Sequence, residues 1–186
     1  NIYPRDLPQK YPKNQTFNYK PVNVNNMLIF ITAEIAANYH GTILSVSLIA
    51  EDNGVLVDSI NISYHKGYPC TPDGVVPKYK AMSEIICFYE KYRCMLVTFA
   101  PYNEAIDTFF ADYKSDLPKD RVIYISSLFA NKTINNAEVS IEKYNLVELA
   151  TYCGIDIPKV VNPSLGDINH KNNKLQRLIY HSLQSL

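Results

Sequence analysis

Apolar and polar residues alternate along the first third of the folded region in a way that is typical of strands. Met27–Ile31 is a continuous apolar run, as expected for a strand buried on both faces. Leu44–Ala50 alternates apolar residues with serines, and Val55–Ser63 alternates again after the turn-forming residues 51–54. Three successive strands with a tight turn before the third predict an antiparallel meander.

Helical spacing follows a loop at His65–Pro77 that is rich in Pro and Gly. Helices are predicted at residues 78–92, 103–113, 146–153 and 165–183, and short buried strands at residues 94–99 and 121–125. The last helix has an apolar stripe that we expect to face the core: Leu165, Ile168, Leu175, Leu178, Ile179 and Leu183. The order β-β-β-α-β-α-β-α-α predicts an α/β domain with a mixed five-stranded sheet and helices on its faces.

Residues 1–26 differ in composition from the rest of the chain. Pro4, Pro8, Pro12 and Pro21 disfavour helix, and aromatic residues stand between them. We therefore expect residues 1–26 to be either an extended linker or an extended arm that packs on the domain or on a partner, and residues 27–186 to form a folded domain.

The composition is that of one globular domain of 186 residues, with 47% hydrophobic and 19% charged residues. The formal net charge is zero, so bulk electrostatics does not favour nucleic acid. No apolar segment reaches the length of about 18 residues that a membrane span requires. The four cysteines lack zinc-site spacing, and no basic-then-apolar leader is present, so we expect an intracellular, reduced protein without a membrane partner.

Three polar motifs stand at successive strand–helix junctions. Glu34 follows the first strand, two residues after Thr32. Asn103 and Asp107 open the helix after the fourth strand, and the sequence from residue 162 to residue 167, Asn-Pro-Ser-Leu-Gly-Asp, opens the last helix. In this order the motifs resemble those of the DEDDh-type 3′–5′ exonucleases of the RNase H-like superfamily, over roughly residues 27–185.

This resemblance implies an RNase H-like fold and a metal site from which parts are missing. Glu34, Asp107 and Asp167 match the acidic ligands of the family, whereas Thr32 replaces its first Asp and Asn162 its His. Two-metal hydrolysis requires several carboxylates, and an asparagine cannot accept the proton of the attacking water. We therefore expect impaired catalysis, with no metal or only weakly bound Mg²⁺ or Mn²⁺ at the three acids.

Two of these residues also fit a structural role, and two histidines could supply the missing base. Asn103 and Asp167 stand where helix-capping residues are expected. His40 or His170 could replace the base, which would leave an active metal-dependent nuclease with altered ligands.

A catalytically impaired domain of this kind is expected to bind single-stranded RNA or DNA. The candidate contacts are Asn103 and the row Lys171, Lys174 and Arg177, which lies opposite the apolar stripe of the last helix. The fifteen tyrosines of the chain could stack on bases. The alternative is a protein-interaction or dimerisation scaffold that does not bind nucleic acid and uses the arm and the loop of residues 64–79.

Overall fold

The computed structural model describes residues 26–38, 41–66, 74–101, 103–113, 121–134, 137–138, 141, 144–159 and 161–185. The arm predicted at residues 1–26 lies outside this part of the chain except for its last residue. Most of the predicted loop at residues 65–77 also lies outside it.

The predicted meander is confirmed, and its strands are longer than the sequence pattern indicated. β1 (Met27–Asn38), β2 (Gly41–Asp52) and β3 (Val55–Lys66) pair antiparallel along their lengths. Asn53 and Gly54, which join β2 to β3, both have positive φ angles, of 49° and 85°. An Asn-Gly pair tolerates this conformation and gives the tight connection that the hairpin needs. Glu51, predicted to lie in the turn, instead belongs to β2 and is buried.

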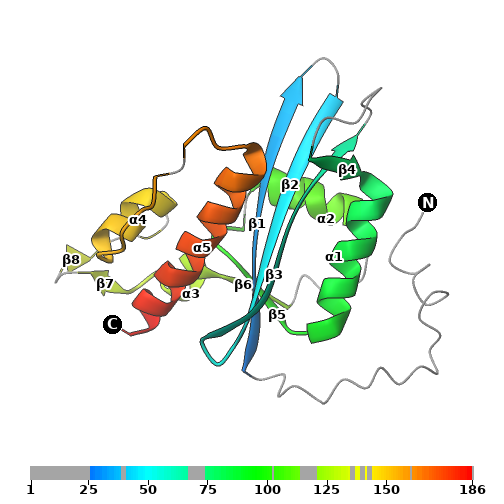
Figure 1. Ribbon diagram of the computed structural model, residues 1–186. Helices are drawn as coiled ribbons and strands as arrows, with labels where there is room; N and C mark the ends of the chain where they lie inside the picture. Colours follow the sequence, from blue (N-terminus) through cyan, green and yellow to red (C-terminus); the bar gives the residue numbers. More distant parts are fainter. Residues whose placement is uncertain are drawn as a thin grey trace.

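The main sheet has six strands in the order β4-β3-β2-β1-β5-β6, one more than predicted (Figure 1). β5 (Met95–Thr98) pairs parallel to β1, and β6 (Val122–Tyr124) pairs parallel to β5. The additional strand, β4 (Val75–Pro77), pairs parallel to the end of β3 inside the segment predicted to be a loop. Its three residues are too few to show an alternating pattern.

Helices cover both faces of the sheet (Figure 1). α1 (Lys78–Tyr92) and α2 (Glu104–Tyr113) enclose one hydrophobic cluster against the face that carries Ile29 and Ile31. α4 (Leu146–Tyr152) and α5 (Leu165–Gln184) enclose a second cluster around Phe30 on the opposite face. The structure therefore confirms an α/β domain with a mixed sheet between two helical layers.

Three short elements were not predicted. α3 (Ile125–Leu128) follows β6 directly, and β7 (Thr133–Ile134) pairs with β8 (Ala137–Glu138) in a separate two-stranded sheet.

None of the helices in the described ranges is both long enough and apolar enough to cross a membrane.

Candidate functional site

α5 lies on the sheet through a row of buried amide side chains rather than through an apolar stripe alone. Asn169, Asn173 and Gln176 are fully buried. Asn169 Nδ2 donates to Ser45 O at 3.0 Å, and Asn173 Nδ2 donates to Phe30 O and to Ser47 O, each at 2.9 Å. These bonds attach the helix to β1 and β2. We call this row, with its contacts to the two strands, the amide seam.

The amide seam corrects the predicted orientation of the last helix. Ile168 and Leu178, expected to face the core, are 41% and 43% exposed, whereas Leu175, Ile179 and Leu183 are buried as expected. Gly166 on α5 permits a close approach to β3, since a Cβ atom at this position would lie 3.4 Å from Ser63 Oγ. The spacing of residues 169, 173 and 176 was visible in the sequence, but three amides on a helix ordinarily indicate a solvated face.

A cavity of about 380 Å³ opens beside the seam, between the middle of β1 and the carboxyl end of β5. We call it the amide-lined cavity. Its polar lining consists of amides, hydroxyls and one carboxylate: Asn103, Asn145, Asn172, Gln176, Thr32, Thr98 and Glu34. Phe99, Leu146 and Val147 add apolar surface. Three residues singled out in the sequence therefore lie here, namely Thr32, Glu34 and Asn103.

Thr32 and Glu34 both contact α5. The Thr32 hydroxyl donates to Asn169 O at 3.1 Å, so the residue that the resemblance aligns with the first Asp of the exonucleases helps to dock the helix. Glu34 is half-buried, and its Oε1 accepts from Asn172 Nδ2 at 3.4 Å. Glu34 is thus the single carboxylate among the described residues that line the amide-lined cavity.

Asn103 and Asp107 stand at the start of α2, with different surroundings. Asn103 Oδ1 accepts from the Ile106 N–H at 3.0 Å, which is the contact of a helix N-cap. Asp107 is exposed and is not part of the lining of the amide-lined cavity. The capping role of Asn103 is therefore confirmed, and its side chain still reaches the cavity wall.

Asp167 has a capping role at the start of α5. Its Oδ2 accepts from the Ser164 N–H at 3.1 Å, and its own N–H donates to Ser164 Oγ at 3.1 Å, a reciprocal capping box. These contacts lower the pKa of Asp167, the Ser164 backbone N–H making the largest contribution. Asn162, which the resemblance aligns with the His of the exonucleases, is exposed with a φ of 48°. Neither Asp167 nor Asn162 lines the amide-lined cavity.

The acids that the resemblance assigned to metal therefore have separate surroundings. Within the described ranges, no group of three or more His, Cys, Asp or Glu side chains is arranged to hold a metal ion. Among the described lining residues, Glu34 is the one carboxylate that could bind a cation in the amide-lined cavity.

Of the two histidines considered as replacement bases, His170 lies in the described part of the chain and does not line the amide-lined cavity. His170 Nδ1 lies 2.7 Å from Ser47 Oγ, and burial, with a smaller effect from Lys174, lowers the pKa of His170. His40 is outside the described residues.

The basic row predicted on α5 is divided between two environments. Lys174 is exposed and Lys171 half-buried. Arg177 instead donates from Nε to Oε2 of the buried Glu51 at 2.8 Å, and from its terminal Nη2 to Gly54 O at 2.8 Å. Arg177 is therefore a structural ion-pair partner, which leaves the two lysines as the accessible cations of the row.

Comparison with known proteins gave no match to a protein-family model, to a curated protein or to a solved structure.

Proposed function

We propose that the chain is a catalytically inactive RNase H-like domain that binds single-stranded nucleic acid in the amide-lined cavity. The order of elements, a three-stranded meander followed by parallel strands and helices, supports this fold assignment. The position of the cavity supports a binding role. The cavity lies beyond the carboxyl end of the parallel strand β5, and ligands of open α/β sheets bind outside the carboxyl ends of such strands.

The observation that carries the proposal is the unpaired oxygen of Gln176. Its Nε2 donates to Ile31 O at 3.0 Å and to Asn173 Oδ1 at 3.1 Å, so acceptors fix the orientation of the amide. Oε1 is buried and accepts no hydrogen bond from the residues that the structure describes. An unsatisfied buried acceptor costs about 1–3 kcal/mol. Because Gln176 lines the cavity, a ligand N–H or O–H group could remove this cost.

The other lining groups fit a nucleobase and its sugar better than a phosphate. Asn172 presents a donor and an acceptor, the groups that recognise base edges. Asn145 contributes its Nδ2 donor, since its Oδ1 accepts from the Glu148 N–H at 2.9 Å, and the half-buried Phe99 offers an aromatic surface for stacking. The carboxylate of Glu34 disfavours a phosphate in the same space. We assign the phosphates of the bound strand to the accessible cations Lys171 and Lys174 on α5.

Fluorescence anisotropy with labelled single-stranded RNA and DNA in EDTA tests the proposal. We expect metal-independent binding that Asn172→Ala and Phe99→Ala each weaken by about tenfold, since stacking and base contacts contribute about 1–3 kcal/mol each. Asp107→Ala, an exposed acid outside the cavity, is the matched control and should not change the affinity. Lys171→Ala and Lys174→Ala should each reduce the slope of log affinity against log salt by about 1. The proposal would be refuted if neither the RNA nor the DNA bound. It would also be refuted if Asn172→Ala and Asp107→Ala changed the affinity equally.

A protein-interaction scaffold is the second candidate, and the start of β3 favours it. Val55, Leu56 and Val57 are consecutive and are 67%, 58% and 49% exposed. A run of exposed apolar residues on a strand is a common feature of interaction surfaces. If this surface forms a dimer, light scattering should give twice the monomer mass for the wild type and the monomer mass for Leu56→Asp. A monomeric wild type would exclude the dimer form of this candidate.

A further inference from the structure

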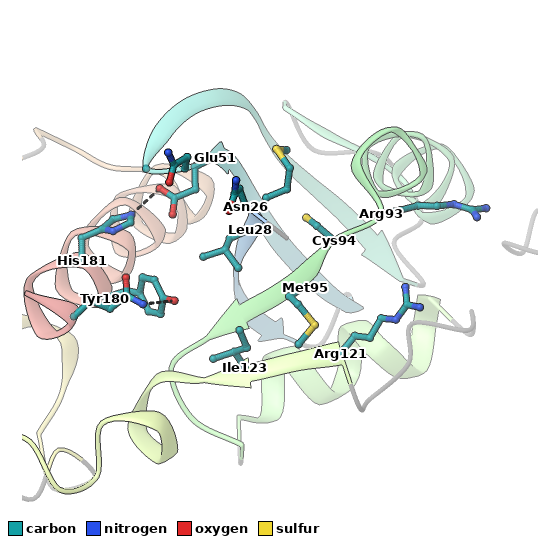
Figure 2. Close-up of a pocket in the computed structure, with 14 residues that line it drawn as sticks. Asn26, Leu28, Glu51, Arg93, Cys94, Met95, Arg121, Ile123, Tyr180 and His181 are labelled. Atoms are coloured by element: carbon teal, nitrogen blue, oxygen red, sulfur yellow. Dashed lines mark hydrogen bonds and ion pairs between the residues drawn. The ribbon is translucent and has the colours of Figure 1, made fainter. Parts of the chain in front are cut away.

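A second and larger cavity lies at the opposite end of β1 and β5, where these strands begin. Its volume is about 730 Å³, within the range of about 300–1,000 Å³ that small-molecule sites occupy. Figure 2 shows three kinds of lining group, with the apolar side chains between the polar ones: Glu51 and His181 on one side, Leu28, Met95 and Ile123 in the middle, and Arg93 and Arg121 on the other side. We call this the strand-start cavity.

The first side of the strand-start cavity is built around a buried carboxylate. Glu51 is 1% exposed, and its Oε2 accepts from Arg177 Nε at 2.8 Å and lies 2.7 Å from His181 Nε2. Both contacts go to Oε2, and Oε1 receives no hydrogen bond from the described residues. Removing a carboxylate from water is costly unless it is paired, and Arg177 compensates the charge here. Glu51 Oε1 is thus an oriented acceptor that remains available to a ligand.

The other side of the cavity carries positive charge on exposed side chains. Arg93 stands in a left-handed conformation at the end of α1 and shares its charge with Glu90, whose Oε2 lies 2.7 Å from Arg93 Nε. Arg121 is exposed at the start of the segment that leads into β6, and its side chain hydrogen-bonds the Tyr89 hydroxyl, which leaves further N–H donors of the guanidinium for a ligand. Guanidinium groups bind phosphate preferentially, because their planar N–H pattern matches the phosphate oxygens.

We propose that the strand-start cavity binds a nucleotide whose base carries an amino group. The amino group donates to Glu51 Oε1, the base lies on Leu28 and Ile123, and the phosphate contacts Arg121. One part of the cavity lining accounts for each part of the ligand. The amino group matches the acceptor Glu51 Oε1, the flat base matches the apolar middle, and the phosphate matches the arginine side. The site does not depend on the amide-lined cavity, because the two cavities lie at opposite ends of the same strands.

Calorimetric titration of the full chain with CMP, UMP and cytidine tests the assignment. Cytosine presents an amino donor at the position where uracil presents a carbonyl acceptor, so the two nucleotides differ mainly in the group that meets Glu51. We expect CMP to bind about tenfold more tightly than UMP, and also about tenfold more tightly than cytidine, which lacks the phosphate. Failure of CMP to bind at millimolar concentration, or equal affinities for the three compounds, would overturn the proposal.

Variants locate the binding in this cavity. Arg121→Ala should weaken CMP about tenfold and keep the preference for CMP over UMP, whereas Lys80→Ala, an exposed cation on α1, should change neither. Glu51→Gln should remove the preference for CMP. If loss of the Arg177 pairing unfolds that variant, the wild-type ligand series and Arg121→Ala still decide the matter, since unchanged CMP binding by Arg121→Ala would refute the site.

A final comparison shows whether the nucleotide is free or the end of a strand, and it distinguishes binding in one cavity from binding in the other. A short oligocytidylate that binds more tightly than CMP, with the same loss in Arg121→Ala, would indicate the end of a strand as the ligand. Equal or weaker binding of the oligomer would indicate a free nucleotide. Asn172→Ala, in the amide-lined cavity, should leave CMP binding unchanged, so failure of one binding site is distinguishable from failure of the other.

Discussion

The hydroxyl of Tyr64 on β3 donates to Asp112 Oδ2 on α2 at 3.0 Å, and both side chains are buried. The other oxygen of Asp112 lies 2.6 Å from Lys66 Nζ and 3.4 Å from Lys78 Nζ. Burial, and then the negative charge of Asp112, raise the pKa of Tyr64 far above its ordinary value, so the hydroxyl stays a donor at neutral pH. One carboxylate thus joins α2, the end of β3 and the start of α1.

Asp112→Ala is expected to lower the free energy of unfolding by about 3 kcal/mol, because it leaves a buried hydroxyl and two nearby ammonium groups without their acceptor. Urea unfolding followed by circular dichroism measures the change. Asp107→Ala, on the exposed face of the same helix, is the matched control and should stay within about 0.5 kcal/mol of wild type. Equal losses in the two variants would show that the buried network does not stabilise the fold.

Asn173→Ala is expected to lower the free energy of unfolding by about 2–4 kcal/mol. The substitution removes the donor to Phe30 O and Ser47 O and leaves a void in the amide seam. Lys174→Ala, one residue away and exposed, should be nearly neutral in the same urea titration. If both variants unfold at the wild-type midpoint, the seam does not hold α5 on the sheet.

The capping box of α5 should make stability depend on the charge of Asp167. Its folded-state pKa lies below the ordinary value of 3.8, so its contribution is complete above about pH 4 and is lost as the pH falls through the folded pKa. The difference in unfolding free energy between wild type and Asp167→Asn should therefore shrink on acidification. Thermal melts from neutral to acidic pH measure it. A difference that is the same at every pH would contradict the capping role.

The elements that the sequence predicted well are those in which one local signal dominates. β2 and β3 alternate between two unlike faces and are joined by Asn53-Gly54, whose turn preference is independent of the rest of the chain. β4 and α3 are too short to show a period. α5 was found at almost the correct length, but its orientation was only partly right, because amides buried against backbone carbonyls have no local signature.

The same difference between local signals and tertiary contacts explains which residues of the candidate sites could be predicted. Glu34 and Asn103 were predicted to follow strands, and the structure places both at the amide-lined cavity, although Glu34 lies inside β1. Gln176 and Asn145 reach that cavity from α5 and from the start of α4, and only the tertiary arrangement brings them together. Glu51 looked like a turn residue beside Asn53, and its burial depends on Arg177, 126 positions further along the chain.

Introducing the Asp and the His that the exonuclease resemblance calls for should not produce hydrolysis. In a Thr32→Asp, Asn162→His variant, the new carboxylate would lie near Glu34, but Asp107 and Asp167 would remain outside the amide-lined cavity, and Asp167 would remain in its capping box with Ser164. Two-metal catalysis needs these acids around one pair of cations. Incubation with labelled single-stranded RNA and DNA in Mg²⁺ or Mn²⁺ should therefore give no cleavage. A thermal melt must first show that the variant folds, because Thr32 loses its contact with Asn169 O. Cleavage that disappears on adding Asp107→Ala would show instead that the acids converge, and the inactive-domain proposal would fail.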